Sequence, residues 1–227
     1  MRELLYVSRT KLESFHLPSR GLPVSGGEVE FSLPGARLRL AGPSGPGPGP
    51  DTLAKLPRVA KRLRKEAKAS TDPSLSPGQW FFFDHEMSCG TACVVTSGLP
   101  DLALFHPVQL DLQAGGLVLC GSAGHLTAQL GEPTRCTSNL SWLFEEIAQE
   151  EGGGQPVDDT TSVVRGVRRV VGRLNRDLVR LRLSGLARAL YVCPPHVDPR
   201  YPGIRTEGRL VLGTPLYVEI GPWNPKW

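Results

Sequence analysis

Short apolar runs follow one another between Trp80 and Leu126, and Gly, Pro or Asp separates each run from the next. The runs read WFFFDHEM, TACVV, LALFHPV and LVLCGSAGHL. Brief runs rich in Val, Phe and Leu are typical of buried strands. We therefore expect successive strands of one sheet here, with a turn at Gly90 between the first two.

Both ends of the chain also show strand patterns. Residues 3–8, ELLYVS, lead into RTKLESF, where apolar residues three apart predict that the strand runs into a short helix. Residues 27–42 hold two alternating segments around Pro34-Gly35, which predicts a hairpin. The segment 209–220, RLVLGTPLYVEI, predicts a strand that bulges or lies at an edge, because it contains a glycine and a proline.

Three segments show helical spacing. The first helix is predicted over 57–69, because proline is favoured at the first helical position. A second is predicted over 138–151, between a serine cap and three glycines. The third, over 161–183, has the clearest helical period: its apolar stripe includes Val170 and Leu174, and arginines occupy the opposite side.

Strands and helices that alternate irregularly indicate an α+β fold class, with a mixed β-sheet covered by amphipathic helices. A chain of 227 residues with 40% hydrophobic content can bury such a core. We expect a single domain over residues 1–227. Within it, the Gly/Pro-rich segment 42–52 is expected to form a flexible loop.

The net charge of the chain is small. Lys and Arg number 26 against 22 Asp and Glu, a formal charge of +4, so no strong overall attraction to nucleic acid or anionic lipid is expected. Basic residues gather in residues 53–69 and 160–192, which leaves nucleic-acid binding through Arg-rich helices as an alternative. The basic faces at 58–68 and 165–180 contain no interleaved aromatic residues and no recognisable reading motif, so we expect solvated faces.

The five cysteines do not form the dense framework of a small secreted domain, and we interpret them as reduced, buried thiols. The first residues lack the apolar region of a signal peptide. No span of twenty predominantly apolar residues occurs. We therefore expect a cytoplasmic protein with no membrane partner.

One cluster of possible metal ligands occurs, in the segment HEMSCGTAC. On a helix, His85, Cys89 and Cys93 would share one face as three zinc ligands. The flanking residues favour strands, in which positions four apart are separated by roughly 13 Å, too far to share a metal. A turn at Gly90 would shorten that distance, but we expect buried residues, no metal and no cofactor.

The small-residue turn that begins at Gly121 is the strongest candidate for a site. Ser122 follows a strand between two small residues, in a relaxed form of the nucleophile elbow. A serine hydrolase built on it would use His196 as base, with Asp158 or Asp159 as the third residue. No oxyanion donor pair is evident, so this hydrolase is the alternative rather than the favoured function.

The same turn has a second interpretation as an anion site. A helix over 125–130 would leave backbone N–H groups at the strand end, where its dipole favours a phosphate or carboxylate. The candidate ligand-binding residues are Gly121, Ser122, Gly124 and His125, with a nearby arginine adding contacts. The spacing matches neither common nucleotide fingerprint. In the competing interpretation, the glycines exist only so that neighbouring backbones can pack.

Four segments of the chain resemble an uncharacterised family of actinobacterial proteins of this length. They are Tyr6-Val7-Ser8 with Lys11-Leu12, LCGSAGHL at 119–126, Leu186-Ala187-Arg188 and LGTPLYV at 212–218. The resemblance spans nearly the whole chain. It implies one full-length unit in a bacterial cytoplasm and brings no assigned activity, ligand or catalytic residue.

No set of residues supplies an acid, a base and a nucleophile in a recognisable pattern. We therefore expect a non-enzymatic cytoplasmic binding or regulatory module whose partner is an anionic small molecule or nucleotide. The alternatives are the serine hydrolase with Ser122 and His196, and the nucleic-acid-binding protein with Arg-rich helices.

Overall fold

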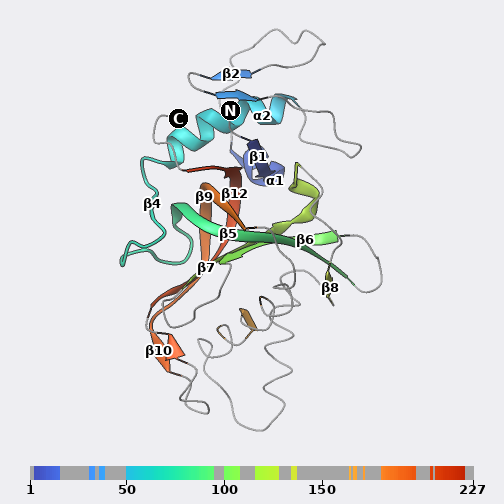
Figure 1. The fold of residues 1–227 in the computed structure, drawn as a ribbon. Helices are drawn as coiled ribbons and strands as arrows, with labels where there is room; N and C mark the ends of the chain where they lie inside the picture. Colours follow the sequence, from blue (N-terminus) through green and yellow to red (C-terminus); the bar gives the residue numbers. More distant parts are fainter. Residues whose placement is uncertain are drawn as a thin grey trace.

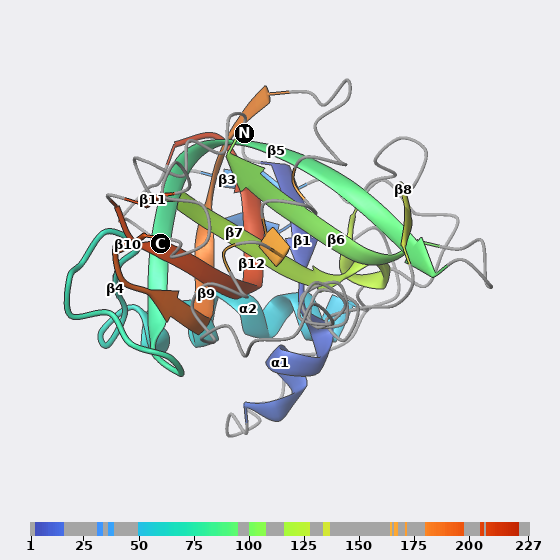
Figure 2. The same ribbon diagram turned by 90° about the horizontal axis from the view of Figure 1, so that it is seen from below.

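The computed structural model describes residues 3–15, 31–33, 36–38, 50–94, 100–107, 116–127, 134–136, 164, 166–167, 171, 180–197, 205–206 and 208–222. Strands make up most of these ranges, and five strands close into a barrel (Figures 1 and 2). The predicted α+β fold class, a mixed sheet covered by helices, is therefore wrong. The physical reason is closure, because strands that pair in a ring bury one face of the sheet against itself.

The barrel strands are β5 (Trp80–Val94), β6 (Pro100–Pro107), β7 (Gly116–Ser122), β9 (Arg180–Cys193) and β12 (Leu210–Ile220). Each strand pairs with the next in the order β12-β7-β6-β5-β9, and β9 pairs again with β12. The β7–β12 pair is parallel and the other four pairs are antiparallel. Strands between residues 80 and 126 are thus confirmed, but the first two predicted strands form one continuous strand, β5, so the region contributes three barrel strands.

Shorter strands extend the barrel sheet. β1 (Glu3–Val7) is antiparallel to β12, and β4 (Lys68–Ala69) and β8 (Thr134–Cys136) are both parallel to β5. The pair β2 (Phe31–Leu33) and β3 (Ala36–Leu38) is antiparallel, which confirms the predicted hairpin. The pair β10 (His196–Val197) and β11 (Arg205–Thr206) forms a further small sheet.

The barrel interior is filled by large apolar side chains. Because successive residues of a strand point to opposite faces, every second position of β5 faces inward. Phe81, Phe83 and Met87 occupy such positions and are at most 1% exposed. They belong to a buried cluster with Phe105 of β6 and Leu119 of β7. Each such side chain contributes roughly 1.5–3 kcal/mol by leaving water, so this cluster is the main source of stability in the described part of the chain.

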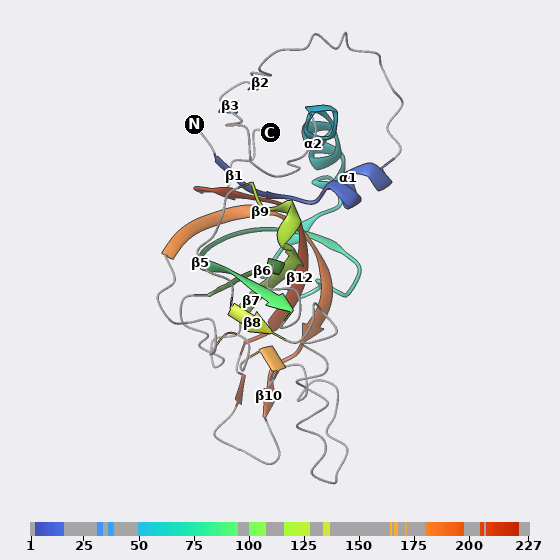
Figure 3. The ribbon, with the colours of Figure 1, turned by 90° about the vertical axis from the view of Figure 1, so that its right-hand side faces the viewer.

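Two helices pack outside the barrel, above it in Figures 1 and 3. α1 (Arg9–Ser14) follows β1, as predicted. α2 (Pro50–Leu63) starts seven residues before the predicted start, so Pro57 lies inside the helix and residues 50–52 are not part of a loop. Five side chains of α2 are buried against α1, β1 and the outer barrel face: Leu53, Leu56, Val59, Ala60 and Leu63. Leu53 and Leu56 precede Pro57 and are buried in the same cluster, so their burial stabilises a helical turn ahead of the proline.

The third predicted helix, over 161–183, is only partly tested. Val164, Gly166, Val167 and Val171 are helical and buried. Residues 180–183 belong instead to β9, where exposed Arg182 alternates with buried Leu183. The strand period of two therefore replaces the helical period there. Val170, Leu174 and the predicted helix over 138–151 lie outside the described residues.

β12 changes neighbours along its length. Its pairing with β9 shifts register at Leu212/Gly213 and at Pro215/Tyr217, which confirms the predicted bulging. Residues 210–213 pair with β7, and residues 217–220, after the second shift, pair with β1. β1 and β7 therefore lie end to end along one edge of β12. Within the described ranges, no helix has the length and apolarity needed to cross a membrane.

Gly185 of β9 lies where two barrel strands approach closely. A Cβ built on this glycine would overlap the backbone carbonyl oxygen of Tyr217 and lie 2.9 Å from Cζ of Phe83. Since a paired backbone oxygen cannot move aside, we expect Gly185→Ala to lower the free energy of unfolding by about 1–3 kcal/mol in urea denaturation.

Gly124→Ala is the matched control, because among the described residues the new Cβ would meet only Ser122 Oγ, at 3.6 Å. This control should change the free energy of unfolding by less than about 0.5 kcal/mol. Equal effects of the two substitutions would contradict a steric role for Gly185.

Candidate functional site

One end of the barrel opens into a cavity of about 400 Å³. The register places this end where β6 finishes and where β7 and β12 begin, because Met87 pairs with Pro107 and Gly116 with Leu210. Three buried side chains of the barrel interior, Met87, Leu117 and Val211, form its apolar floor. Its polar wall consists of Ser70, Thr71, His85, Glu86 and Arg209. We call this space the barrel-end cavity.

Ser70 and His85 contact each other in the cavity wall. The hydroxyl oxygen Oγ of Ser70 lies 2.9 Å from Nε2 of His85. Burial lowers the pKa of His85 below its usual 6.5, and the nearby Asp84 carboxylate opposes this shift only partly. The imidazole is therefore neutral at pH 7, so that one ring nitrogen donates a hydrogen bond and the other accepts one.

Arg209 fixes the segment that contains Ser70. Its Nη1 and Nη2 atoms donate to the carbonyl oxygens of Asp72 and Leu75, at 2.5 and 2.6 Å. The half-buried guanidinium has five N–H donors, so three remain after these two bonds. Arg209 therefore both shapes the wall and brings a positive charge to the cavity.

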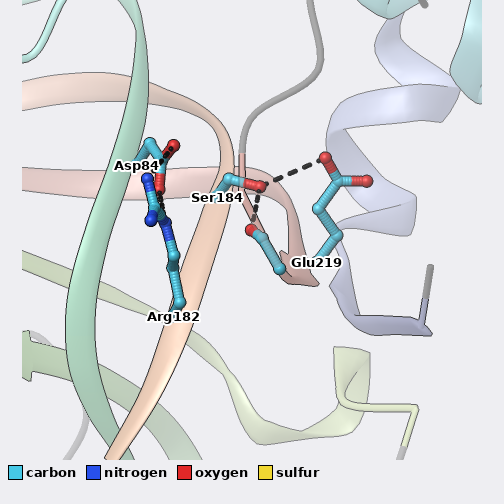
Figure 4. A network of polar contacts seen from close by, with 5 residues as sticks. Asp84, Arg182, Ser184 and Glu219 are labelled. Carbon is cyan, nitrogen blue, oxygen red and sulfur yellow. Dashed lines mark hydrogen bonds and ion pairs between the residues drawn. The ribbon is translucent and has the colours of Figure 1, made fainter.

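Asp84 precedes His85 in β5 but faces the other side of the strand. Its carboxylate binds the guanidinium of Arg182 through two bonds, at 2.8 and 3.1 Å (Figure 4). Beside this pair, Oγ of buried Ser184 lies 2.8 Å from the carbonyl oxygen of Gly221 and 3.2 Å from Oε1 of Glu219. These contacts link β5, β9 and β12, and they direct Asp84 away from His85.

The segments that carry the family resemblance meet at the other end of β7. Lys11 Nζ donates to Thr214 Oγ1 at 2.7 Å and to the carbonyl oxygen of Pro215 at 2.8 Å. Tyr6 Oη lies 3.2 Å from Nδ1 of His125. Residues 6–12, 119–126 and 212–218 are therefore spatial neighbours, although more than a hundred positions separate the first from the second. This contact region joins α1 and β1 to the barrel.

The predicted anion site, Gly121 to His125, lies in this contact region. A Cβ at Gly121 would overlap the Tyr6 hydroxyl, so packing alone explains that glycine. The predicted helix from residue 125 is wrong where described, because Ala123–His125 form a short 3-10 turn, η1, and Leu126 is extended. Ser122 Oγ already accepts a hydrogen bond from the Gly124 N–H at 3.3 Å. Anion binding at this turn stays a prediction.

The two residues of the alternative hydrolase lie at opposite ends of the barrel. Cys193 pairs with Leu210, so β10 with His196 follows at the same end as Gly116. Ser122 is at the far end of β7, about 20 Å away at roughly 3.3 Å per residue. The structure therefore does not bring Ser122 and His196 together. Asp158 and Asp159 lie outside the described residues.

The possible zinc ligands are spread along one strand. β5 is continuous from Trp80 to Val94, and Gly90 pairs with Leu104, so the predicted turn at Gly90 is wrong. His85, Cys89 and Cys93 are thus about 13 Å apart from one to the next. Among the residues that the structure describes, no group of three potential ligands could hold a metal ion.

The basic face of α2 is accessible. Arg58, Lys61 and Arg62 are exposed on the side of the helix opposite its buried residues, and Lys65 is exposed in the turn that follows. The other basic segment, 160–192, is only partly described, and from residue 180 it is a strand. Nucleic-acid binding through these residues stays a prediction.

Sequence reasoning missed Ser70, His85 as a partner of Ser70, and Arg209. Ser70 follows a predicted helix and His85 lies in an apolar run, so no local motif links them. Their contact depends on the parallel pairing of β4 with β5, which the two residues of β4 could not reveal. The one feature of the sequence that could have indicated this site is the charged Arg209 at the start of the predicted strand 209–220.

Comparison with known proteins gives one match. A family model described as a family of unknown function (DUF7019) matches residues 2–221. No curated protein and no solved structure matches the chain. An uncharacterised family, as expected from the sequence, is therefore confirmed, and no relative supplies a function.

Lys11 makes the stability of the fold depend on pH. Burial lowers the pKa of Lys11 from 10.5 to about 8. Between these two values the unfolded chain binds a proton that the folded chain has lost, so the contribution of Lys11 to the free energy of unfolding rises with pH. We expect the stability of the wild type relative to Lys11→Met to increase from about pH 7 to about pH 10 in urea unfolding.

The comparison with Lys11→Met is needed because other groups titrate in the same window. Burial raises the pKa of Cys120 from 9.0 to about 12, so its contribution falls as pH rises. Cys120 is present in both proteins, and its effect largely cancels in the difference. A difference that does not change across this window would contradict the lowered pKa of Lys11.

Proposed function

The chain belongs to the DUF7019 family of unknown function, and we propose that it binds a small organic anion in the barrel-end cavity. The observation that supports this proposal best is the convergence of one cation and several hydrogen-bonding groups on a cavity with an apolar floor. Binding sites for small molecules commonly combine an apolar lining with a few placed polar groups. The cavity volume of about 400 Å³ lies in the usual range of such sites.

The polar wall favours an anionic group over a cationic one. Arg209 retains three N–H donors beyond its two carbonyl bonds, a number that allows bidentate contact with a carboxylate or phosphate. The hydroxyls of Ser70 and Thr71 can donate to the same group. Glu86 is the only carboxylate among the described lining residues, and it is exposed, so water screens its charge more than that of half-buried Arg209.

The apolar floor determines the chemical character of the ligand beyond its anionic group. Met87, Leu117 and Val211 are each at most 5% exposed and are continuous with the barrel interior. They leave little apolar surface exposed, so a small apolar body is enough to cover it, at a gain of about 25 cal/mol for each Å² removed from water. We therefore propose a carboxylate or phosphate with a small apolar body, bound without a metal or other cofactor.

We also propose that the protein works in a reducing compartment such as the cytoplasm. Three of its cysteines, Cys89, Cys120 and Cys193, are buried free thiols, which suits a compartment where thiols stay reduced.

A thermal-shift screen of small carboxylates and phosphates tests the binding proposal. A ligand at a hundred times its Kd should stabilise the protein by about 2.7 kcal/mol. Thr71 is exposed at the rim, so we expect Thr71→Trp to fill the cavity and abolish the shift without disturbing the core. The control is Thr10→Trp, at an exposed position on α1, which should keep the shift.

A second control separates the cavity from the turn at Gly121 to His125. In the described part of the chain, a Cβ at Gly124 meets only the Ser122 hydroxyl, so Gly124→Val should fold. A shift that survives Thr71→Trp but disappears in Gly124→Val would move the site to the turn. No stabilisation by any anion, or equal loss in both tryptophan variants, would contradict binding in the cavity.

A further inference from the structure

We propose that Ser70 is a nucleophile activated by His85, and that the barrel-end cavity cleaves small carboxylic esters. This inference rests on the proposed function, because the ester must enter the same cavity. It adds a reaction to the binding event and assigns it to a serine different from the one that the turn sequence suggested.

The two side chains have the geometry of a nucleophile and its base. A base must lie about 2.6–3.2 Å from the atom whose proton it removes, and Ser70 Oγ is 2.9 Å from His85 Nε2. Both residues line the cavity, so a bound ester can approach the hydroxyl.

Paired strands hold both residues in place. Lys68 and Ala69 of β4 pair with Phe81 and Phe82 of β5, and the Ser70 N–H donates to the carbonyl oxygen of Phe82 at 2.9 Å. His85 lies three residues farther along the same β5 strand. Ser70 is a turn residue directly after β4, and its bond to Phe82 continues the pairing of β4 with β5, so the sheet positions its hydroxyl beside His85.

The protonation state suits a general base. Burial keeps His85 neutral at pH 7, and a neutral imidazole can accept the Ser70 proton. Arg209 brings a positive charge to the same cavity, where it can stabilise the oxyanion that forms on the attacked carbonyl.

The reaction balances with water as the only co-substrate. Ser70 Oγ forms a bond to the ester carbonyl carbon, and its proton moves to His85 Nε2. The intermediate collapses, the bond from carbon to the alcohol oxygen breaks, and His85 returns the proton to that oxygen. Water then attacks the acyl carbon and gives a proton to His85. The bond from that carbon to Ser70 Oγ breaks, His85 passes the proton to Oγ, and a carboxylic acid leaves.

The lining defines the substrate class. Met87, Leu117 and Val211 accept an apolar acyl or alcohol group, and the volume of about 400 Å³ limits the ester to a small one. The acid product is a small carboxylate, the same class of anion that the proposed function assigns to this cavity.

Ser122 offers a matched control. It is exposed and accepts a hydrogen bond from the Gly124 N–H, while Nδ1 of the nearby His125 contacts Tyr6. Ser122 therefore has no histidine partner among its described contacts. A general serine reagent should distinguish these two serines.

The test uses the full chain with a fluorophosphonate probe and short-chain p-nitrophenyl esters. We expect the probe to label Ser70, located by mass spectrometry, and hydrolysis to depend on the same residue. Ser70→Ala should abolish labelling and hydrolysis, His85→Gln should lower both at least about 100-fold, and Ser122→Ala should leave both unchanged. Thermal unfolding of each variant shows that it is folded.

The rate of labelling should also rise with pH as His85 loses its proton, and this dependence should disappear in His85→Gln. A merely structural serine would not show it. No labelling of the folded wild type, or labelling that persists in Ser70→Ala, would overturn the nucleophile.

The experiments distinguish failure of the binding proposal from failure of the Ser70 proposal. If no labelling occurs but anions stabilise the protein and Thr71→Trp blocks them, the cavity binds ligands and Ser70 is not a nucleophile. If neither labelling nor stabilisation occurs, both proposals are overturned.

Discussion

Closure of the barrel depends on how closely β9 and β12 approach the interior aromatic rings. Gly185 and Gly213 lie on these strands, and a Cβ on either would come within 3 Å of Phe83 or Phe81. The rings fill the space that the missing side chains leave, so the same two glycines permit both the close strands and the large side chains. Without this fit the sheet could not curl far enough for β9 to meet β12.

Closure gives the two ends of the barrel different chemistry. At one end, β1, α1 and the turn after β7 cover the strands, and Tyr6 fills the space beside Gly121. At the other end, the apolar interior reaches a cavity whose wall carries Arg209 and His85. A ligand site needs accessible space as well as polar groups, and among the described residues the second end offers both.

The polar wall of the cavity is assembled from distant parts of the chain. Ser70 follows β4, His85 lies within β5, and Arg209 precedes β12. Arg209 then fixes the Ser70 segment through two carbonyl bonds, so the start of β12 controls the position of a hydroxyl 139 residues away. These two bonds and the bond from the Ser70 N–H to Phe82 tie the wall to the barrel strands, which favours a preorganised binding site.

The sequence alone determined the local elements. Short apolar runs predicted strands between residues 80 and 126, alternation predicted the hairpin around Pro34-Gly35, and an internal glycine and proline predicted the bulged final strand. These features depend on neighbouring residues. It also indicated the uncharacterised family. At residues 180–183 the apolar positions fit both a helical period and a strand period, and the helix predicted over 161–183 wrongly included the start of β9.

Only the tertiary structure decided that the sheet closes and where the cavity lies. Closure requires β9 to pair with both β5 and β12, and no local pattern encodes which strands pair. The contact between Ser70 and His85 has the same origin, since the pairing of β4 with β5 brings together two residues that share no motif. Conversely, Gly121, the first of the small residues that marked the turn as a site candidate, makes room for Tyr6, because a missing side chain makes room equally well for a ligand or for a neighbouring ring.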